Sequence, residues 1–182
     1  MDNNSKIGTL LATSWAKRGQ GKYAEAQALL NEAHELCEDN DYNHLGRISH
    51  IYGQFESDHN NHQQALEFWQ QSLEYYKKDG NSNKIAHSTR HIADIQRRLG
   101  DQEGSEKNYR QSLDIYRSNA KTSSGDLANA LRGFGLLLVQ RGKITEAISV
   151  WKEVKKRYQA LHLQEGVDEA NGKLDQLIKK SE

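Results

Sequence analysis

Two sets of residues have the types and spacing that catalytic or metal chemistry would need. Cys37 is the only cysteine in the 182 residues, and a thiol beside a histidine can act as a nucleophile. His87 and His91 lie four residues apart, so a helix would present both imidazoles on one side. His50 could approach them there, and three imidazoles are suitable metal ligands.

None of these patterns completes a recognised site. Residues 87–91 read HSTRH and lack the glutamate of the HExxH metalloprotease motif. A GxG pattern begins at Gly133, but the strand that precedes a nucleotide-binding turn is missing. The sequence therefore predicts no catalytic residues, no metal, no cofactor and no enzyme activity. A metal-binding protein or enzyme that uses the three histidines is kept as one alternative.

The charge balance of the protein narrows the class of partner. It has 25 Lys and Arg against 25 Asp and Glu, a net charge of zero and a pI near 7.1. A nucleic-acid-binding protein needs a basic surface, so we expect no nucleic-acid partner. No apolar segment resembles a signal peptide or a membrane span, which predicts a cytoplasmic protein without a membrane partner. A single cysteine fits a reducing compartment.

The periodicity of apolar residues predicts helices throughout. Proline is absent, and apolar residues recur every three or four positions between isolated glycines. The expected helices pair as 5–20 with 22–38, 43–58 with 61–78, 83–99 with 102–117, and 126–141 with 143–161. A ninth helix, at 165–180, has an apolar stripe and a polar opposite side, as an end cap should.

The sequence also repeats itself four times. A small residue recurs at spacings of 39, 40 and 42 residues, and a bulky residue follows it four positions later. The small series is Ala26, Ala65, Ser105 and Ala147, and the bulky series is Leu30, Trp69, Tyr109 and Trp151. Twelve residues before the small series comes a second one, Ser14, Gly53, Ala93 and Gly135. The turns fall at Gly21, Asn60, Gly100 and Gly142.

This pattern predicts stacked helical hairpins. Small residues let two antiparallel helices approach closely, and bulky residues fill the space between successive hairpins. Cys37 aligns with Tyr76, Tyr116 and Tyr158, so we interpret it as a packing residue and not as a nucleophile.

The segments GKYAEA and GKITEA and the series above resemble the tetratricopeptide repeat (TPR). The resemblance covers nearly the whole sequence. The pitch exceeds the usual value of about 34 residues, and the proline that ends the repeat is missing. The long pitch is similar to that of cell-polarity adaptors, kinesin light chains and bacterial peptide-sensing regulators. The resemblance implies an all-α, right-handed α-solenoid that forms one array over residues 1–182. Its four hairpins would cover about 5–40, 43–79, 83–118 and 126–162, followed by the capping helix at 165–180.

The same resemblance implies that the first helix of each hairpin lines a concave groove where a partner binds. The inner positions are Gly8, Leu11, Trp15 and Arg18; Arg47, His50, Gln54 and Ser57; His87, Arg90, Asp94 and Arg97; and Asn129, Arg132, Leu136 and Val139. Five arginines stand against one acid, and arginine binds carboxylates through a two-pronged guanidinium. We therefore predict a non-enzymatic adaptor that binds a protein or peptide, with an acidic segment or the C-terminus of the partner as its ligand.

The predicted peptide-binding residues are Trp15, Arg47, His50, Gln54, His87, Arg90, Asp94, Arg97, Asn129 and Arg132. Trp15 and Leu11 would provide an apolar anchor at one end. Replacing Arg90 and Arg132 with Glu is expected to abolish binding and to leave helicity and melting nearly unchanged. In one alternative the arginines form a solvated surface, partly paired with Asp94 and with acids at helix ends.

A further alternative is a self-associating structural module. The N-terminal end carries Trp15 and Leu11 and shows no obvious polar cap, so two copies could pair there as a homodimer.

Overall fold

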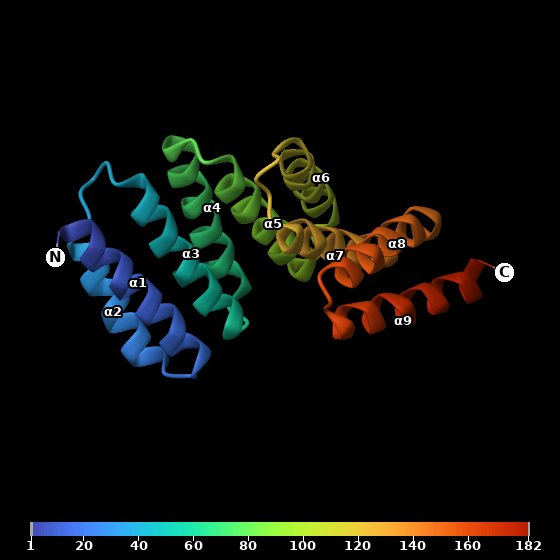
Figure 1. Cartoon of the computed structure of the whole chain (residues 1–182), viewed down its shortest axis with the longest axis horizontal. Helices are drawn as coiled ribbons and strands as arrows, with labels where there is room; N and C mark the ends of the chain where they lie inside the picture. Colours follow the sequence, from blue (N-terminus) through green and yellow to red (C-terminus); the bar gives the residue numbers. More distant parts are fainter. Residues whose placement is uncertain (1, 182) are drawn as a thin grey trace. The chain divides into compact units, whose positions relative to one another are not determined.

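The computed structural model describes residues 2–181, and these form nine α-helices and no strand (Figure 1). The helices are α1 (Asn3–Gly19), α2 (Tyr23–Glu35), α3 (Tyr42–Asp58), α4 (His62–Asp79), α5 (Ser82–Leu99), α6 (Gln102–Ser118), α7 (Ser124–Gln140), α8 (Ile144–Ala160) and α9 (Gln164–Ser181). Every boundary lies within three residues of the one expected from the sequence. The all-α repeat fold is therefore confirmed.

The protein divides into two compact units. The first unit is residues 2–88 and the second is residues 89–181, with the boundary between Ser88 and Thr89 inside α5. The assignment of all 182 residues to one continuous array stays a prediction.

The small and bulky residues make the contacts that pair the helices. A Cβ atom on Gly53 would lie 2.9 Å from the Trp69 ring, and one on Gly135 would lie 2.9 Å from the Trp151 ring. The first hairpin is closed by a hydrogen bond of 2.8 Å from Ser14 Oγ to the carbonyl oxygen of Ala26. All members of both small series and of the bulky series are buried.

The turns inside the hairpins have the conformation that their residue types predicted. Gly21, Asn60, Gly100 and Gly142 all have positive φ, between 61° and 88°. Glycine adopts such angles without a steric penalty, and asparagine tolerates them better than most residues do.

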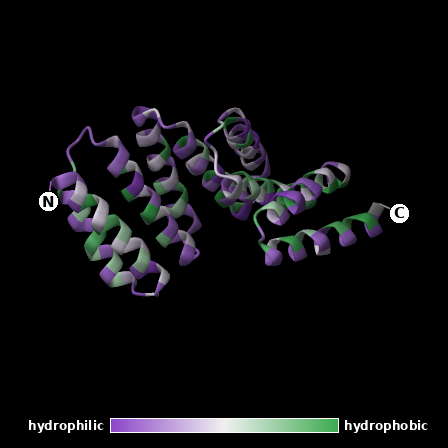
Figure 2. Cartoon of the chain, in the orientation of Figure 1, coloured by the Kyte–Doolittle hydropathy of each residue, from purple (hydrophilic) through white to green (hydrophobic). Residues whose placement is uncertain are grey.

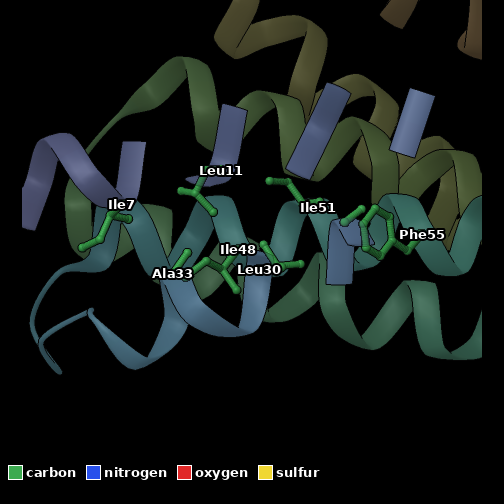
Figure 3. Packing of buried hydrophobic residues seen from close by; sticks show 8 residues of the cluster. Ile7, Leu11, Leu30, Ala33, Ile48, Ile51 and Phe55 are labelled. Carbon is green, nitrogen blue, oxygen red and sulfur yellow. The ribbon is translucent and has the colours of Figure 1, made fainter. Parts of the chain in front are cut away.

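The core of the first unit is formed by apolar residues of α1, α2 and α3 (Figure 3). It includes Leu11, whose side chain is 0% exposed, together with Ile7, Leu30 and Ile51. Leu11 therefore stabilises the fold, and the expectation that it forms an exposed anchor with Trp15 is wrong. A stripe with helical spacing has one central position that is fully buried, and Leu11 occupies it.

The last helix has the two-sided character of a cap (Figure 2). Val167, Ala170, Leu174 and Leu177 are buried on one side. On the other side Asp168 and Asp175 are exposed, forty residues after the buried Ala128 and Gly135 of α7. Ala128 and Gly135 pack in the interior of the last complete hairpin, whereas the two aspartates would have to be desolvated under another helix.

The N-terminal end is also charged. Lys6 pairs with Glu32 at 3.0 Å and Lys17 pairs with Glu25 at 2.6 Å, both from α1 to α2. Lys6 stands at the repeat position of Leu45, which is buried in the second hairpin. The expectation that this end has no polar cap is therefore wrong. Along residues 2–181, no helix combines the length and the apolar character needed to cross a membrane.

Candidate functional site

The predicted binding residues fall into one set in each unit. The first unit contains Trp15, Arg47, His50, Gln54 and His87. The second unit contains Arg90, Asp94, Arg97, Asn129 and Arg132. A single groove that includes both sets stays a prediction.

Three rings line up across the first helices of the first unit, and we call Trp15, His50 and His87 the inner row. The Trp15 and His50 ring centroids are 5.9 Å apart, and those of His50 and His87 are 4.9 Å apart with nearly parallel planes. Below them the fully buried Trp69 meets His50 edge-on at 4.7 Å. Trp15 is 40% exposed, so the row ends in a large ring that is accessible to a partner.

The arginine next to the inner row is already paired. The Arg18 guanidinium lies 4.1 Å from the Trp15 ring centroid and forms an ion pair with Asp58. The other carboxylate oxygen of Asp58 accepts a hydrogen bond of 2.9 Å from Gln54. Asp58 was not among the predicted residues, although its spacing of four from Gln54 indicates such a contact.

Arg47 provides an accessible cation in this unit. Its side chain is exposed, and it makes no ion pair within residues 2–181. It lies one residue after Gly46, whose missing side chain makes room for the Tyr76 ring. Burial raises the pKa of Tyr76, and the nearby charge of Arg47 opposes that rise. A carboxylate ligand could therefore reach Arg47 without displacing an internal partner.

In the second unit Asp94 connects the predicted Arg90 with the buried Tyr109. Arg90 donates to Asp94 Oδ2 at 2.8 Å, and the Tyr109 hydroxyl donates to Asp94 Oδ1. Burial first, and then the charge of Asp94, raise the pKa of Tyr109. A Cβ atom on Gly133 would lie 2.6 Å from the Tyr109 oxygen, so a glycine is needed where α7 crosses this network.

Arg132 is also paired, with a residue of the capping helix. Its Nε and one terminal nitrogen donate to the two carboxylate oxygens of Glu169 at 2.6 and 2.7 Å. These hydrogen bonds are the main cause of the raised pKa of Arg132. The nearby Asn129 accepts a 3.0 Å hydrogen bond from the Tyr158 hydroxyl.

These contacts correct the expected electrostatics. Three of the five inner arginines, Arg18, Arg90 and Arg132, hold internal carboxylates. Glutamate at position 90 or 132 would stand beside Asp94 or Glu169. The expectation that these two substitutions leave stability unchanged therefore does not fit the structure, because like charges in contact are destabilising. The inner arginines are therefore partly paired with acids, as expected in the alternative where they form a solvated surface.

The surroundings of Cys37 and His91 favour a structural role for both residues. Cys37 is half-buried, its Sγ lies 3.3 Å from the Ala33 carbonyl oxygen, and burial raises its pKa to about 11. A thiol with that pKa is a poor nucleophile near neutral pH. His91 Nε2 lies 2.5 Å from Arg90. The described residues contain no group of three His, Cys, Asp or Glu side chains placed to hold a metal.

Comparisons with known proteins identify the fold. Residues 44–118 match the model of the tetratricopeptide repeat family. The solved structure of RapI in its apo form superposes with a TM-score of 0.84 at 17% identity, over 99% of this protein and 68% of RapI. A putative kinesin light chain with nearly identical TPR-like repeats, from Podosopora anserina, gives 0.67 at 14% identity, over 100% and 99%.

A third structure contains a ligand. The Rap conjugation gene regulator of the plasmid pLS20, in complex with the Phr* peptide, gives a TM-score of 0.65 at 13% identity. The match covers 96% of this protein and 59% of the regulator. No curated protein matches the sequence. At these identities the three likenesses describe the fold.

Proposed function

We propose that this protein, whose residues 44–118 match the tetratricopeptide repeat family, is a non-enzymatic adaptor that binds a peptide segment of a partner protein on the inner surface of its units. The proposal rests mainly on the inner row of the first unit. A Rap regulator with a similar fold has been solved with a peptide bound, which supports the same class of ligand here.

The inner row has the features of a binding hot spot. Trp15 contacts both the Arg18 guanidinium and the His50 ring, and these contacts restrict its orientation before a ligand arrives. Fixed aromatic side chains next to arginine contribute much of the binding energy at interfaces because little conformational entropy is lost. An apolar side chain of the peptide would pack on Trp15 and the His50–His87 stack. An acidic side chain or the terminal carboxylate would bind Arg47, with Gln54 donating to the backbone.

In the second unit the proposed contacts are Arg90, Asp94, Arg97, Asn129 and Arg132. Here a peptide would meet the guanidinium groups of Arg90 and Arg132, which already hold carboxylates. Neutral hydrogen-bonding side chains are therefore favoured over acidic ones at this surface.

Selection of random peptides displayed on phage, with the intact wild-type protein as bait, tests the proposal. A selected peptide is then labelled and titrated by fluorescence anisotropy. We expect Trp15→Ala and Arg47→Glu each to weaken binding by about tenfold or more, the usual loss at a hot spot. Lys152→Glu, at an exposed position of α8, has the same charge change as Arg47→Glu and should have little effect. Binding that is equal in all variants, or a selection without enrichment, would overturn the proposal.

A further inference from the structure

A second groove in the first unit lies among α2, α3 and α4, and we call it the outer groove. It encloses a hollow of about 240 Å³. Its lining includes His34, Ser49, Tyr52, Phe68, Gln71 and Tyr75, none of which belongs to the inner row. The second unit has a groove at the same place in its repeat, among α6, α7 and α8, with a hollow of about 370 Å³.

The two grooves share repeat positions and differ in charge. Phe134 in the second unit stands where the first has Tyr52, and Glu153 stands where it has Gln71. In the second unit two ion pairs cross the groove from α6 to α8. Arg110 pairs with Glu146 at 2.8 Å, and Arg117 pairs with Glu153 at 3.0 Å.

Arg110 also covers the aromatic floor of its groove. The guanidinium carbon lies 4.8 Å from the centroid of the Phe134 ring. The corresponding residue in the first unit is Asn31, which accepts a hydrogen bond from the Tyr52 hydroxyl instead. In both units the residue at this repeat position contacts the ring at the matching position, Phe134 or Tyr52. This agreement supports the alignment of the two grooves.

The outer groove of the first unit is open where the other is bridged. Asn31 and Gln64 occupy the positions of Arg110 and Glu146, and both are exposed and uncharged. The lining contains no Asp, Glu, Lys or Arg, and the Tyr52 and Phe68 rings stack at 5.0 Å. An aromatic surface with neutral walls is thus accessible to an apolar side chain.

The surroundings of this groove are acidic. Glu35, Glu67 and Glu74 are exposed and each lies beside a lining residue along α2 or α4. Glu74 is the one of these that pairs with a lysine, Lys77, at 2.7 Å. Residues 1–88 contain eight Lys and Arg against twelve Asp and Glu, whereas residues 89–182 contain seventeen against thirteen. The zero net charge of the whole protein therefore conceals an acidic first unit.

We propose that the outer groove binds a basic amphipathic helix of a partner protein. Apolar side chains on one stripe of that helix would pack on Tyr52 and Phe68. Its Lys or Arg side chains would face Glu35 and Glu67. A helix lying in a groove between two helices presents such anchors at intervals of three and four residues. This surface is separate from the inner row, so the intact protein has two different docking surfaces.

Transfer of the Arg110–Glu146 ion pair to the first unit tests the proposal. The double variant Asn31→Arg/Gln64→Glu places the Arg110–Glu146 pair over the outer groove at two exposed positions and leaves the net charge unchanged. Arg110→Asn/Glu146→Gln in the other groove is the matched control. The probe is a fluorescein-labelled helical peptide of Leu, Lys and Ala, with leucines on one stripe. A second peptide has Glu in place of every Lys.

We expect the lysine peptide to bind wild-type protein and the Asn31→Arg/Gln64→Glu variant to weaken it by about tenfold or more. The control variant and Trp15→Ala should bind it as wild type does, which separates this proposal from the function of the inner row. The glutamate peptide should bind at least about tenfold more weakly. In NMR spectra the peptide should shift the signals of Tyr52 and Phe68.

Three results would overturn the proposal. One is equal binding of both peptides to wild-type protein, and another is equal binding of the lysine peptide to wild type and to the Asn31→Arg/Gln64→Glu variant. The third is a concentration-dependent dimer, seen by sedimentation, that this variant dissociates. That result would assign the groove to a second copy of the protein and not to a basic helix.

Discussion

Tryptophan and glycine form complementary pairs at the helix contacts of two hairpins. Trp69 packs on Gly53 and Trp151 packs on Gly135, whereas the smaller Leu30 aligns with Ser14 and Tyr109 with Ala93. The size of one residue therefore compensates for the size of the other. Close packing requires this compensation, because the interior has few voids that could absorb an extra methyl group.

Two glycines of the second unit have different surroundings, so we expect opposite effects when each is replaced by alanine. In Gly135→Ala the new Cβ would lie 2.9 Å from the Trp151 indole nitrogen, so we expect the free energy of unfolding to fall by about 1–2 kcal/mol. Gly172→Ala, in α9, meets no atom within 4 Å and should raise it by about 0.5–1 kcal/mol through the unfolded state. Urea unfolding of both variants measures the difference. Equal effects would mean that the Trp151 ring is not fixed.

Helix α9 shows how one element is attached to its unit. Buried apolar residues hold one stripe against α8, and the pair between Arg132 and Glu169 links α9 to α7. Both side chains of the pair are partly exposed, at 43% and 30%, so solvent screens much of the attraction. The apolar stripe therefore provides most of the attachment, and the ion pair contributes less. Because the pair occupies the Arg132 guanidinium, it also determines which charges remain available to a ligand.

A charge swap isolates the contribution of this pair. Arg132→Glu should destabilise the fold by about 1 kcal/mol and should increase amide hydrogen exchange in α9, because Glu169 then faces a like charge. The double variant Arg132→Glu/Glu169→Arg should restore most of the loss. Glu169→Gln alone should cost less, since no repulsion is created. A double variant as unstable as the single one would show that the two side chains do not interact in solution.

The sequence predicted the elements well and the site only in part, for one physical reason. Helix ends and turns depend on nearby residues, so Gly100 and Gly142 could be recognised from local patterns. The Arg90–Asp94 pair is local, but the other two inner ion pairs depend on residues about one repeat away. Asp58 lies 40 residues after Arg18, and Glu169 lies 37 after Arg132. Both spacings are close to the repeat length. Such partners can therefore be sought in the following repeat, next to its inner positions.

At the scale of the whole molecule, the two ends of the repeated structure expose charge where internal repeats are packed. The outer side of α9 carries Asp168 and Asp175 in place of small buried residues. At the other end the Lys6–Glu32 pair, with both side chains nearly half exposed, stands where the second hairpin has Leu45 and Gln71. Both ends would lose hydration of charged groups if another copy stacked on them. We therefore expect end-to-end association to be unfavourable.

We expect the protein to sediment as a 20.8 kDa species whose mass does not change with protein concentration, because the charged ends oppose stacking. Lys6→Leu/Glu32→Gln gives the first hairpin the residues of the second, the buried Leu45 and the uncharged Gln71, and should cause concentration-dependent association. Lys152→Leu/Glu67→Gln removes the same charges at exposed positions away from the end and should leave the mass unchanged. Association of the wild-type protein would contradict the role of the end charges and would favour the self-associating module instead. Desolvation of a charged pair opposes stacking, whereas burial of a leucine favours it by about 2 kcal/mol, so one pair of residues can decide between a monomer and an assembly.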